Sequence, residues 1–173
     1  MDKTLNSLTS SLGSKLKFTD EIFSNETLSD KKINSSVISK STFNNITFEK
    51  VDFIDSALSN CQFNNCIFNG SSLTTLELCQ CTFVSCKFIK SNFADSEFDS
   101  VTFYSCQFTE VSFSKAYLEN CKIIDTNFKV MEKGGLPPII VNSIISQRSQ
   151  SLTFIADFNF YHLLEFLEIE FRS

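Results

Sequence analysis

Large apolar residues recur at every fifth position of the chain from Ile38 to Phe128, without any change of phase. Most of them are phenylalanine, and the others are leucine or isoleucine. A period of five fits neither the 3.6-residue period of an α-helix nor the two-residue period of a β-strand. A register kept over so long a stretch predicts a repeat architecture, in which each unit packs against its neighbours in space.

A second column of residues lies two positions before each large apolar residue. It contains serine, cysteine, valine and other uncharged residues, most of them small or β-branched. The three remaining positions of each unit hold mainly polar and charged residues. Each unit therefore has one bulky inward residue, one small inward residue and three mostly outward residues. This pattern is typical of a short extended segment followed by a corner.

Units such as Cys61–Asn65 and Ser91–Asp95 place a small residue first and phenylalanine third. Over residues 36–129 this motif resembles that of the pentapeptide-repeat family. The resemblance implies an all-β solenoid, a right-handed quadrilateral β-helix with four pentapeptides per coil and the large apolar residues along its axis. The expected axial phenylalanines are Phe43, Phe48, Phe53, Phe63, Phe68, Phe83, Phe88, Phe93, Phe98, Phe103, Phe108, Phe113 and Phe128.

The two ends of the β-helix are expected to carry short α-helical caps. Leucines spaced three or four apart predict a capping helix within residues 1–17. Residues 18–33 keep the five-residue phase, but Glu21, Glu26 and Lys31 occupy the small column. The sequence therefore leaves open whether this degenerate lead-in forms a regular coil. Residues 34–130 form the predicted β-helix, and residues 131–173 form a C-terminal capping and interaction segment.

The C-terminal segment allows two structural readings. Apolar residues from Phe160 to Phe171 follow helical spacing, whereas Leu167–Phe171 alternates as a strand does, so the state of residues 139–173 stays open with helix favoured. One helical face suffices to cover the end of the β-helix. The apolar residues left over predict a homodimer interface; they are Phe158, Tyr161, Phe166 and Ile169.

Charge and hydropathy exclude several partners. The 173-residue chain has a formal net charge of −5, which argues against binding to nucleic acid or to an anionic membrane. No apolar run has the length of a membrane span, and the N-terminal residues lack an apolar signal region. The sequence therefore predicts a soluble protein of the cytoplasm.

Six of the seven cysteines fall in the small inward column, where a reduced thiol packs as a small apolar residue. We expect a buried thiol ladder formed by Cys61, Cys66, Cys81, Cys86, Cys106 and Cys121. Cys79 follows an axial position and is expected to point outward. Since Cys79 and Cys81 point to opposite sides, a thiolate metal site is not expected, and a redox role rests on the ladder alone.

Catalytic constellations are not recognisable in the sequence. The single histidine, His162, lies far from the serines of the inward column, and carboxylate pairs such as Asp52 and Asp55 occupy outward positions. No glycine-rich phosphate loop is present. The chain is expected to be no enzyme and to bind no cofactor or metal.

The function expected first is a scaffold that presents flat β-helical faces to an unidentified protein partner. The family resemblance implies an alternative, because some members mimic duplex DNA and modulate type II topoisomerases such as gyrase. The acidic residues best placed for such a strip are Asp55, Glu77, Asp95, Glu97, Asp99 and Glu119. Neighbours such as Thr75, Cys79 and Lys115 interrupt the strip, so DNA mimicry ranks second and a thiol-based redox or metal-binding protein third.

Replacing Phe88 by aspartate tests the axial assignment. We expect Phe88→Asp to lose more than about 4 kcal/mol of stability, because a carboxylate without a partner would replace a buried ring. Thermal or urea unfolding followed by circular dichroism measures this loss. The outward substitution Asn92→Asp serves as the control, and equal melting of both variants would contradict the axial position of Phe88.

Overall fold

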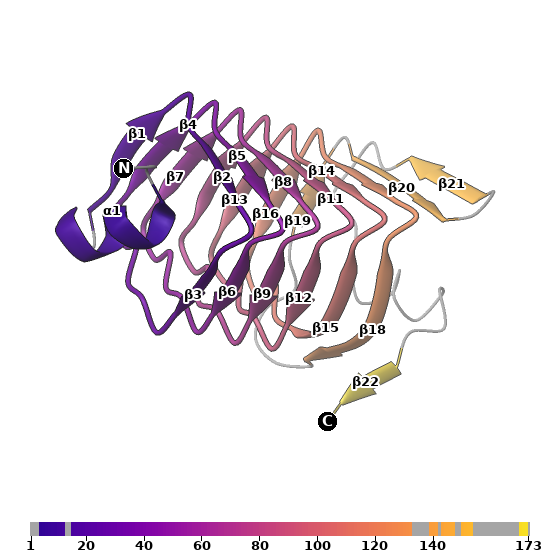
Figure 1. Ribbon diagram of the computed structural model, residues 1–173. Helices are drawn as coiled ribbons and strands as arrows, with labels where there is room; N and C mark the ends of the chain where they lie inside the picture. The colour runs from indigo at the N-terminus through magenta and orange to yellow at the C-terminus, as the bar shows by residue number, and fades with distance from the viewer. Residues whose placement is uncertain are drawn as a thin grey trace.

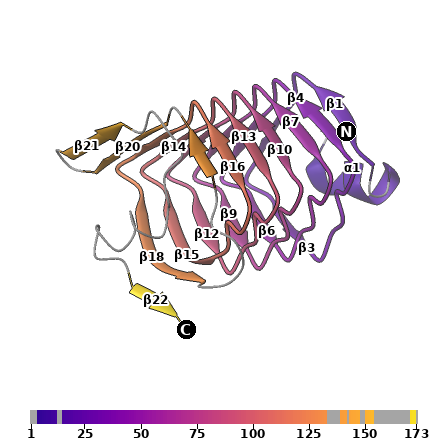
Figure 2. The same cartoon turned by 180° about the vertical axis from the view of Figure 1, so that it is seen from behind.

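The computed structural model describes residues 4–12, 15–132, 139–141, 143–147, 150–153 and 170–172. In this part the chain forms one short helix, α1 (Leu5–Leu12), followed by short strands that stack as successive coils along one axis (Figures 1 and 2). No helix among these residues is long and apolar enough to span a membrane. The predicted all-β solenoid is confirmed, with four faces that we name A to D.

Faces A, B and C are β-sheets built from three-residue strands in almost every coil, and their strand pairs are parallel except for the last pair of face B, which is antiparallel. Face A consists of β1 (Lys17–Thr19), β4 (Val37–Ser39), β7 (Ala57–Ser59), β10 (Glu77–Cys79), β13 (Glu97–Asp99), β16 (Tyr117–Glu119) and β19 (Ile139–Val141). Face B consists of β2 (Ile22–Ser24), β5 (Thr42–Asn44), β8 (Gln62–Asn64), β11 (Thr82–Val84), β14 (Thr102–Tyr104), β17 (Lys122–Ile124), β20 (Ile144–Gln147) and β21 (Gln150–Thr153).

Face C consists of β3 (Thr27–Ser29), β6 (Thr47–Glu49), β9 (Ile67–Asn69), β12 (Lys87–Ile89), β15 (Gln107–Val111), β18 (Asn127–Glu132) and β22 (Glu170–Arg172). Face D is held by single bridges between residues twenty apart, from Lys32 through Asp52 to Ser112. Each bridge on face D is followed by a turn. The four faces together account for the four five-residue units of each coil.

The axis of the solenoid is filled by the large apolar column. Parallel register pairs residues twenty apart, so Phe43, Phe63 and Phe83 lie above one another. Their rings are nearly parallel, with centroids 4.6 and 4.7 Å apart. Rings of neighbouring columns meet edge to face, as Phe83 and Phe88 do at 5.6 Å. Both arrangements are favourable for aromatic pairs, so the column forms a closely packed core.

The last residue of every unit forms a column that the sequence reasoning did not single out. From Asp20 to Asp125, each of these residues has a φ between 48° and 62°, in the left-handed region. Asparagine and aspartate tolerate this region better than other non-glycine residues, and they occupy ten of the twenty-two positions. Gly70 occupies one more. The residue type at this position therefore allows the chain to turn each corner.

The N-terminal lead-in forms a regular coil, which settles a question left open by the sequence. Phe23, Leu28 and Ile33 are buried in the axis like their later counterparts. The carboxylate of Glu26, in the small column, accepts hydrogen bonds from the backbone N–H groups of Leu5 and Asn6 at 2.9 and 3.0 Å. Glu26 thus caps the N-terminus of α1, and this interaction explains why a charged residue can occupy the inward column at position 26.

The predicted helical cap at the C-terminal end is wrong for the residues that the structure describes, because these form strands. β19 and β20 continue faces A and B, and Ile140 and Ile145 lie in register with Leu118 and Ile123. The offset between these partners is twenty-two residues instead of twenty. The β-helix therefore extends beyond residue 130, where the five-residue phase predicted its end. Residues 154–169, where most of the predicted helix falls, lie outside the described residues.

Thr75 is the β-branched residue at a left-handed corner, with a φ of 52°. Its hydroxyl donates to the Asp55 carboxylate at 2.6 Å. We expect Thr75→Asn to raise the free energy of unfolding by about 1 kcal/mol, because asparagine tolerates this backbone conformation and keeps a donor for Asp55. Thr75→Val keeps the strain and removes the hydroxyl, so it should lower stability. Chemical denaturation of both variants measures the difference; a less stable Thr75→Asn would contradict the argument.

Candidate functional site

Among the residues that the structure describes, the interior of the solenoid offers no room for a ligand. The predicted axial phenylalanines from Phe43 to Phe113 are buried, and the side chain of Phe128 lies outside the described residues. A void of about 10 Å³ lies among axial residues that include Phe68, Phe83 and Phe88. This volume is at the lower limit for one water molecule, and the lining is apolar. Any functional site must therefore lie on the outer faces.

Side chains of the small column bridge backbone groups of the coil below. Ser56 Oγ donates to the carbonyl of Ile33 at 2.8 Å and accepts from the N–H of Ser36 at 3.1 Å. Ser96 makes the corresponding bonds to Leu73 and Leu76. The hydroxyl groups of these serines are engaged in hydrogen bonds to the backbone, so none of them is arranged as a nucleophile with a neighbouring base.

The six predicted inward cysteines take the same place as the serines and are all buried and reduced. Each thiol donates to the carbonyl of the residue twenty-three positions earlier, at 3.3 to 3.6 Å; the donors are Cys61, Cys66, Cys81, Cys86, Cys106 and Cys121. Hydrogen bonding to a stacked thiol, together with burial, raises the pKa of Cys81 and Cys86. Burial raises the pKa of Cys121 to about 12. The raised pKa makes Cys81, Cys86 and Cys121 poor nucleophiles at neutral pH, whereas the hydrogen bond from the stacked thiol lowers the pKa of Cys61, Cys66 and Cys106.

The predicted acidic residues gather in one groove, which runs over face A and the edge between faces A and D. We name it the acidic groove and define it by Asp55, Glu77, Asp95, Glu97, Asp99 and Glu119. It has two adjoining hollows of about 220 and 290 Å³, and Glu77 and Glu97 line both. The first hollow also has an apolar wall, which includes Tyr117 and Leu78.

Like charges face each other in this groove. Glu77 and Glu97 are direct partners in adjacent parallel strands, so their side chains leave the sheet on the same side, and both are exposed. Such pairs repel. Above and below them in register lie Tyr117 and Ala57, which limits this acidic column to two coils. The groove is therefore strongly negative over a short length.

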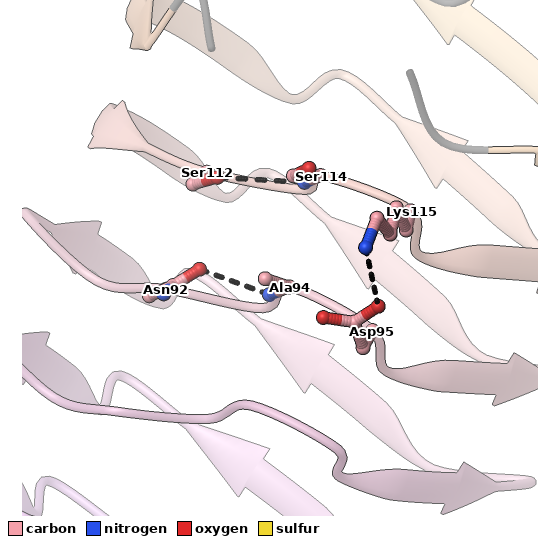
Figure 3. A network of polar contacts seen from close by, with 6 residues as sticks. All are labelled: Asn92, Ala94, Asp95, Ser112, Ser114 and Lys115. Atoms are coloured by element: carbon pink, nitrogen blue, oxygen red, sulfur yellow. Dashed lines mark hydrogen bonds and ion pairs between the residues drawn. The ribbon is translucent and has the colours of Figure 1, made fainter. Parts of the chain in front are cut away.

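An ion pair neutralises one edge of the groove, and a hydrogen bond holds one of the other acidic side chains. Lys115 Nζ lies 3.8 Å from Asp95 Oδ1, with Asn92 and Ser112 capping the neighbouring face D turns (Figure 3). Asp99 accepts from Ser100 Oγ at 2.9 Å. Among the described ion pairs, Lys115–Asp95 is the one that involves a groove carboxylate. Most of the negative charge of the groove is therefore not neutralised.

Metal binding is not supported by the described residues, among which no three His, Cys, Asp or Glu side chains converge as ligands. Cys79, the predicted outward cysteine, is partly buried in the acidic groove, with its Sγ 3.8 Å from Asp99 Oδ2. His162 lies outside the described residues. So does the candidate interface of Phe158, Tyr161, Phe166 and Ile169, and the C-terminal homodimer stays a prediction.

Two structural residues escaped the sequence reasoning. Glu26 caps α1, which no local spacing in the sequence indicates. Ser143 Oγ accepts from the N–H of Cys121 at 3.0 Å and so continues the small column beyond Phe128. The signal for Ser143 was present, because it precedes Ile145 by two residues and Ile145 follows Ile140 by five.

Family models match the repeat region of the chain. A model described as pentapeptide repeat region matches residues 56–132, and one described as pentapeptide repeats (8 copies) matches residues 36–74. No functionally characterised protein with a curated description matches the chain significantly. Together the two models cover more than half of the chain.

The solved structures that match this chain share little sequence with it. The pentapeptide repeat protein Rfr23 from the cyanobacterium Cyanothece 51142 has 7% identity and a TM-score of 0.48, covering 61% of this chain and 86% of its own. QnrB1, a plasmid-mediated fluoroquinolone resistance protein, has 14% identity and a TM-score of 0.38, with coverages of 88% and 98%. HetL from Nostoc sp. PCC 7120 has 12% identity and a TM-score of 0.28, with coverages of 75% and 67%.

The reactivity of Cys79 tests the electrostatics of the groove. Partial burial raises the pKa of Cys79, and the Asp99 carboxylate raises it further. Asp99→Asn removes the charge, so the pKa should fall and the thiolate fraction at pH 7.5 should rise. We expect native alkylation by iodoacetamide to become about threefold faster, as for one unit charge at this distance in a largely aqueous setting. Glu49→Gln on face C is the control, and an unchanged rate in Asp99→Asn would contradict the coupling.

Proposed function

Because the chain belongs to the pentapeptide-repeat family, we propose that it is a non-catalytic scaffold of the cytoplasm that binds a protein partner on its outer surface. The filled axis supports this proposal, since it leaves side chains on the outer faces as the means of recognition. Solenoids of this kind present regular rows of side chains on extended surfaces. No cofactor or metal is part of the proposal.

The acidic groove is the observation that supports this function best. Carboxylates on strands β10, β13 and β16 are held at the spacing of hydrogen-bonded strands, about 4.8 Å. Such a rigid row binds without ordering a flexible loop, which lowers the entropic cost of association. Charge complementarity favours a basic partner segment, and the Tyr117 wall offers apolar contact beside the carboxylates. We therefore propose a partner with clustered lysine or arginine residues.

DNA mimicry, with gyrase as target, is the second candidate, and the same carboxylates are the observation that favours it. Duplex DNA carries one charge per ~1.7 Å along its axis. The groove falls short of this density, because Ala57 and Tyr117 bound the Glu77–Glu97 pair and Lys115 pairs with Asp95. A thiol-based function ranks third, since all six inward thiols are buried and donate to backbone carbonyls.

Neutralising the centre of the groove should abolish partner binding. We expect the full-length protein to capture a basic protein from its native cells, and the triple variant Glu77→Gln, Glu97→Gln, Asp99→Asn to lose at least about 90% of it. Affinity capture with quantitative mass spectrometry measures the loss. A matched variant with three neutralised acids elsewhere, Asp30→Asn, Glu49→Gln and Asp52→Asn, should keep the partner. Equal capture by both variants would refute the groove as the binding site.

Gyrase activity separates the two candidate functions. We expect no inhibition of gyrase supercoiling at micromolar protein, because the acidic column spans too few coils to imitate a duplex. A gel-based supercoiling assay over a protein titration measures this. Inhibition by the native protein that disappears in the groove triple variant would favour DNA mimicry over the scaffold function.

A further inference from the structure

Five adjacent strands of face B differ from the other faces in lacking charge. The outward side chains of strands β2, β5, β8, β11 and β14 are all uncharged, although charged residues make up 20% of the chain. These strands are adjacent in the sheet, and we name their outward surface the neutral face. Face A carries four carboxylates, face C carries Glu49 and Lys87, and face D carries Lys32 and Asp52.

An apolar row begins at the C-terminal end of the neutral face and continues onto the next strand of face B, β17. Val84, Tyr104 and Ile124 are in register on β11, β14 and β17, so they form one continuous row. Tyr104 is 45% exposed, and the other two are partly exposed. Threonines 82 and 102 flank the row. Exposed tyrosine in a surface depleted of charge is the composition found at the centres of protein interfaces.

We propose that the neutral face is a self-association surface, on which a second copy of this chain packs face to face. The distribution of charge favours this surface over the other faces for contact between two copies. Two copies that each have a net charge of −5 repel when acidic surfaces meet, and the neutral face is the sheet surface on which no carboxylates are brought together. Flat sheets pack in this way at about 10 Å separation.

A two-fold axis through β14 gives the contact a definite register. It places Tyr104 of the two copies together and sets Val84 of one copy against Ile124 of the other. Lys122, the charged outward residue on β17, then meets Thr82 and not a second lysine. The isologous arrangement therefore pairs the apolar row with itself and leaves no like charges opposed.

The size of the face limits the strength of the contact. With the axis on β14, β11 and β8 of one copy lie over β17 and β20 of the other, so five strands overlap. At about 4.8 Å per strand they make a surface roughly 24 Å long, and each strand is about 10 Å wide. Such a surface buries a few hundred Å² per copy, below the ~800 Å² per partner of a stable interface. The dimer should therefore be weak, with a dissociation constant on the order of 100 µM.

Sedimentation equilibrium of the full chain between about 10 and 500 µM tests the proposal. The wild-type protein should show a reversible monomer–dimer equilibrium. Tyr104→Lys should weaken it at least about tenfold, since it places two lysines at the axis. Tyr117→Lys adds the same charge on face A and should leave the equilibrium unchanged. A wild-type monomer throughout, an unaffected Tyr104→Lys variant, or equal loss in both variants overturns the proposal.

The register has its own test. Val84→Glu should weaken dimerisation, and the double variant Val84→Glu, Ile124→Lys should restore it, because each glutamate then faces a lysine of the second copy. All these positions are outward, so matching thermal unfolding curves exclude misfolding as the cause. Failure of the double variant to exceed Val84→Glu alone overturns the β14 axis. Retention of the dimer by Tyr104→Lys would indicate association through another surface, such as the C-terminal segment.

Discussion

One distance governs this molecule, because parallel strands and stacked aromatic rings require nearly the same separation. Hydrogen-bonded strands lie about 4.8 Å apart. The rings of Phe68, Phe88 and Phe108 stack with centroids 4.9 and 4.8 Å apart. A coil that satisfies its backbone hydrogen bonds therefore places its phenylalanines at stacking distance without strain. Two independent interactions reinforce one geometry, and the chain can repeat it coil after coil.

This constraint determines what the other positions of the unit can hold. The small column must fit beside the rings, and its serine, threonine and cysteine members also reach the backbone of the coil below with a single hydrogen-bonding atom. Ser71 and Cys66 make equivalent bonds to Phe48 and Phe43 at 3.1 and 3.3 Å. The abundance of thiols is thus explained by packing. Recognition chemistry is left to the outward residues, whose identity the fold does not restrict.

The sequence predicted the repetitive part of the fold because the pattern there is redundant. Axial and small columns, four units per coil and the clustering of Glu77, Glu97 and Asp99 all follow from the five-residue phase. The hollows of the groove do not, because they depend on how side chains such as Tyr117 lie. The corner column was overlooked although its asparagines and aspartates signalled it. The period of the apolar residues alone does not indicate the sign of the backbone φ angle at the corners.

The sequence-based prediction failed at the two ends of the solenoid, where the five-residue pattern is no longer repeated from unit to unit. At the C-terminal end, helical spacing of apolar residues competed with the open edges of three parallel sheets, and for the described residues strand pairing prevails. Local propensity is a weak prior against such tertiary pairing. Ile140 and Ile145 do keep the five-residue spacing, but in a shifted phase that a strict count from Phe128 misses. At the N-terminal end, the cap formed by Glu26 joins residues twenty or more apart, a distance at which sequence spacing carries no signal.

The change of offset from twenty to twenty-two between the last coils has a consequence for how such a protein can vary. The axial column resumes after the extra residues, with Leu118 and Ile140 still in register. The number of residues between two coils can therefore change without disturbing the stacking that holds the coils together. The chain between two faces can accept additional residues as long as the next axial side chain returns to its place. The solenoid thus has natural graft points, where new surface segments can be acquired or engineered while the aromatic core is conserved unchanged.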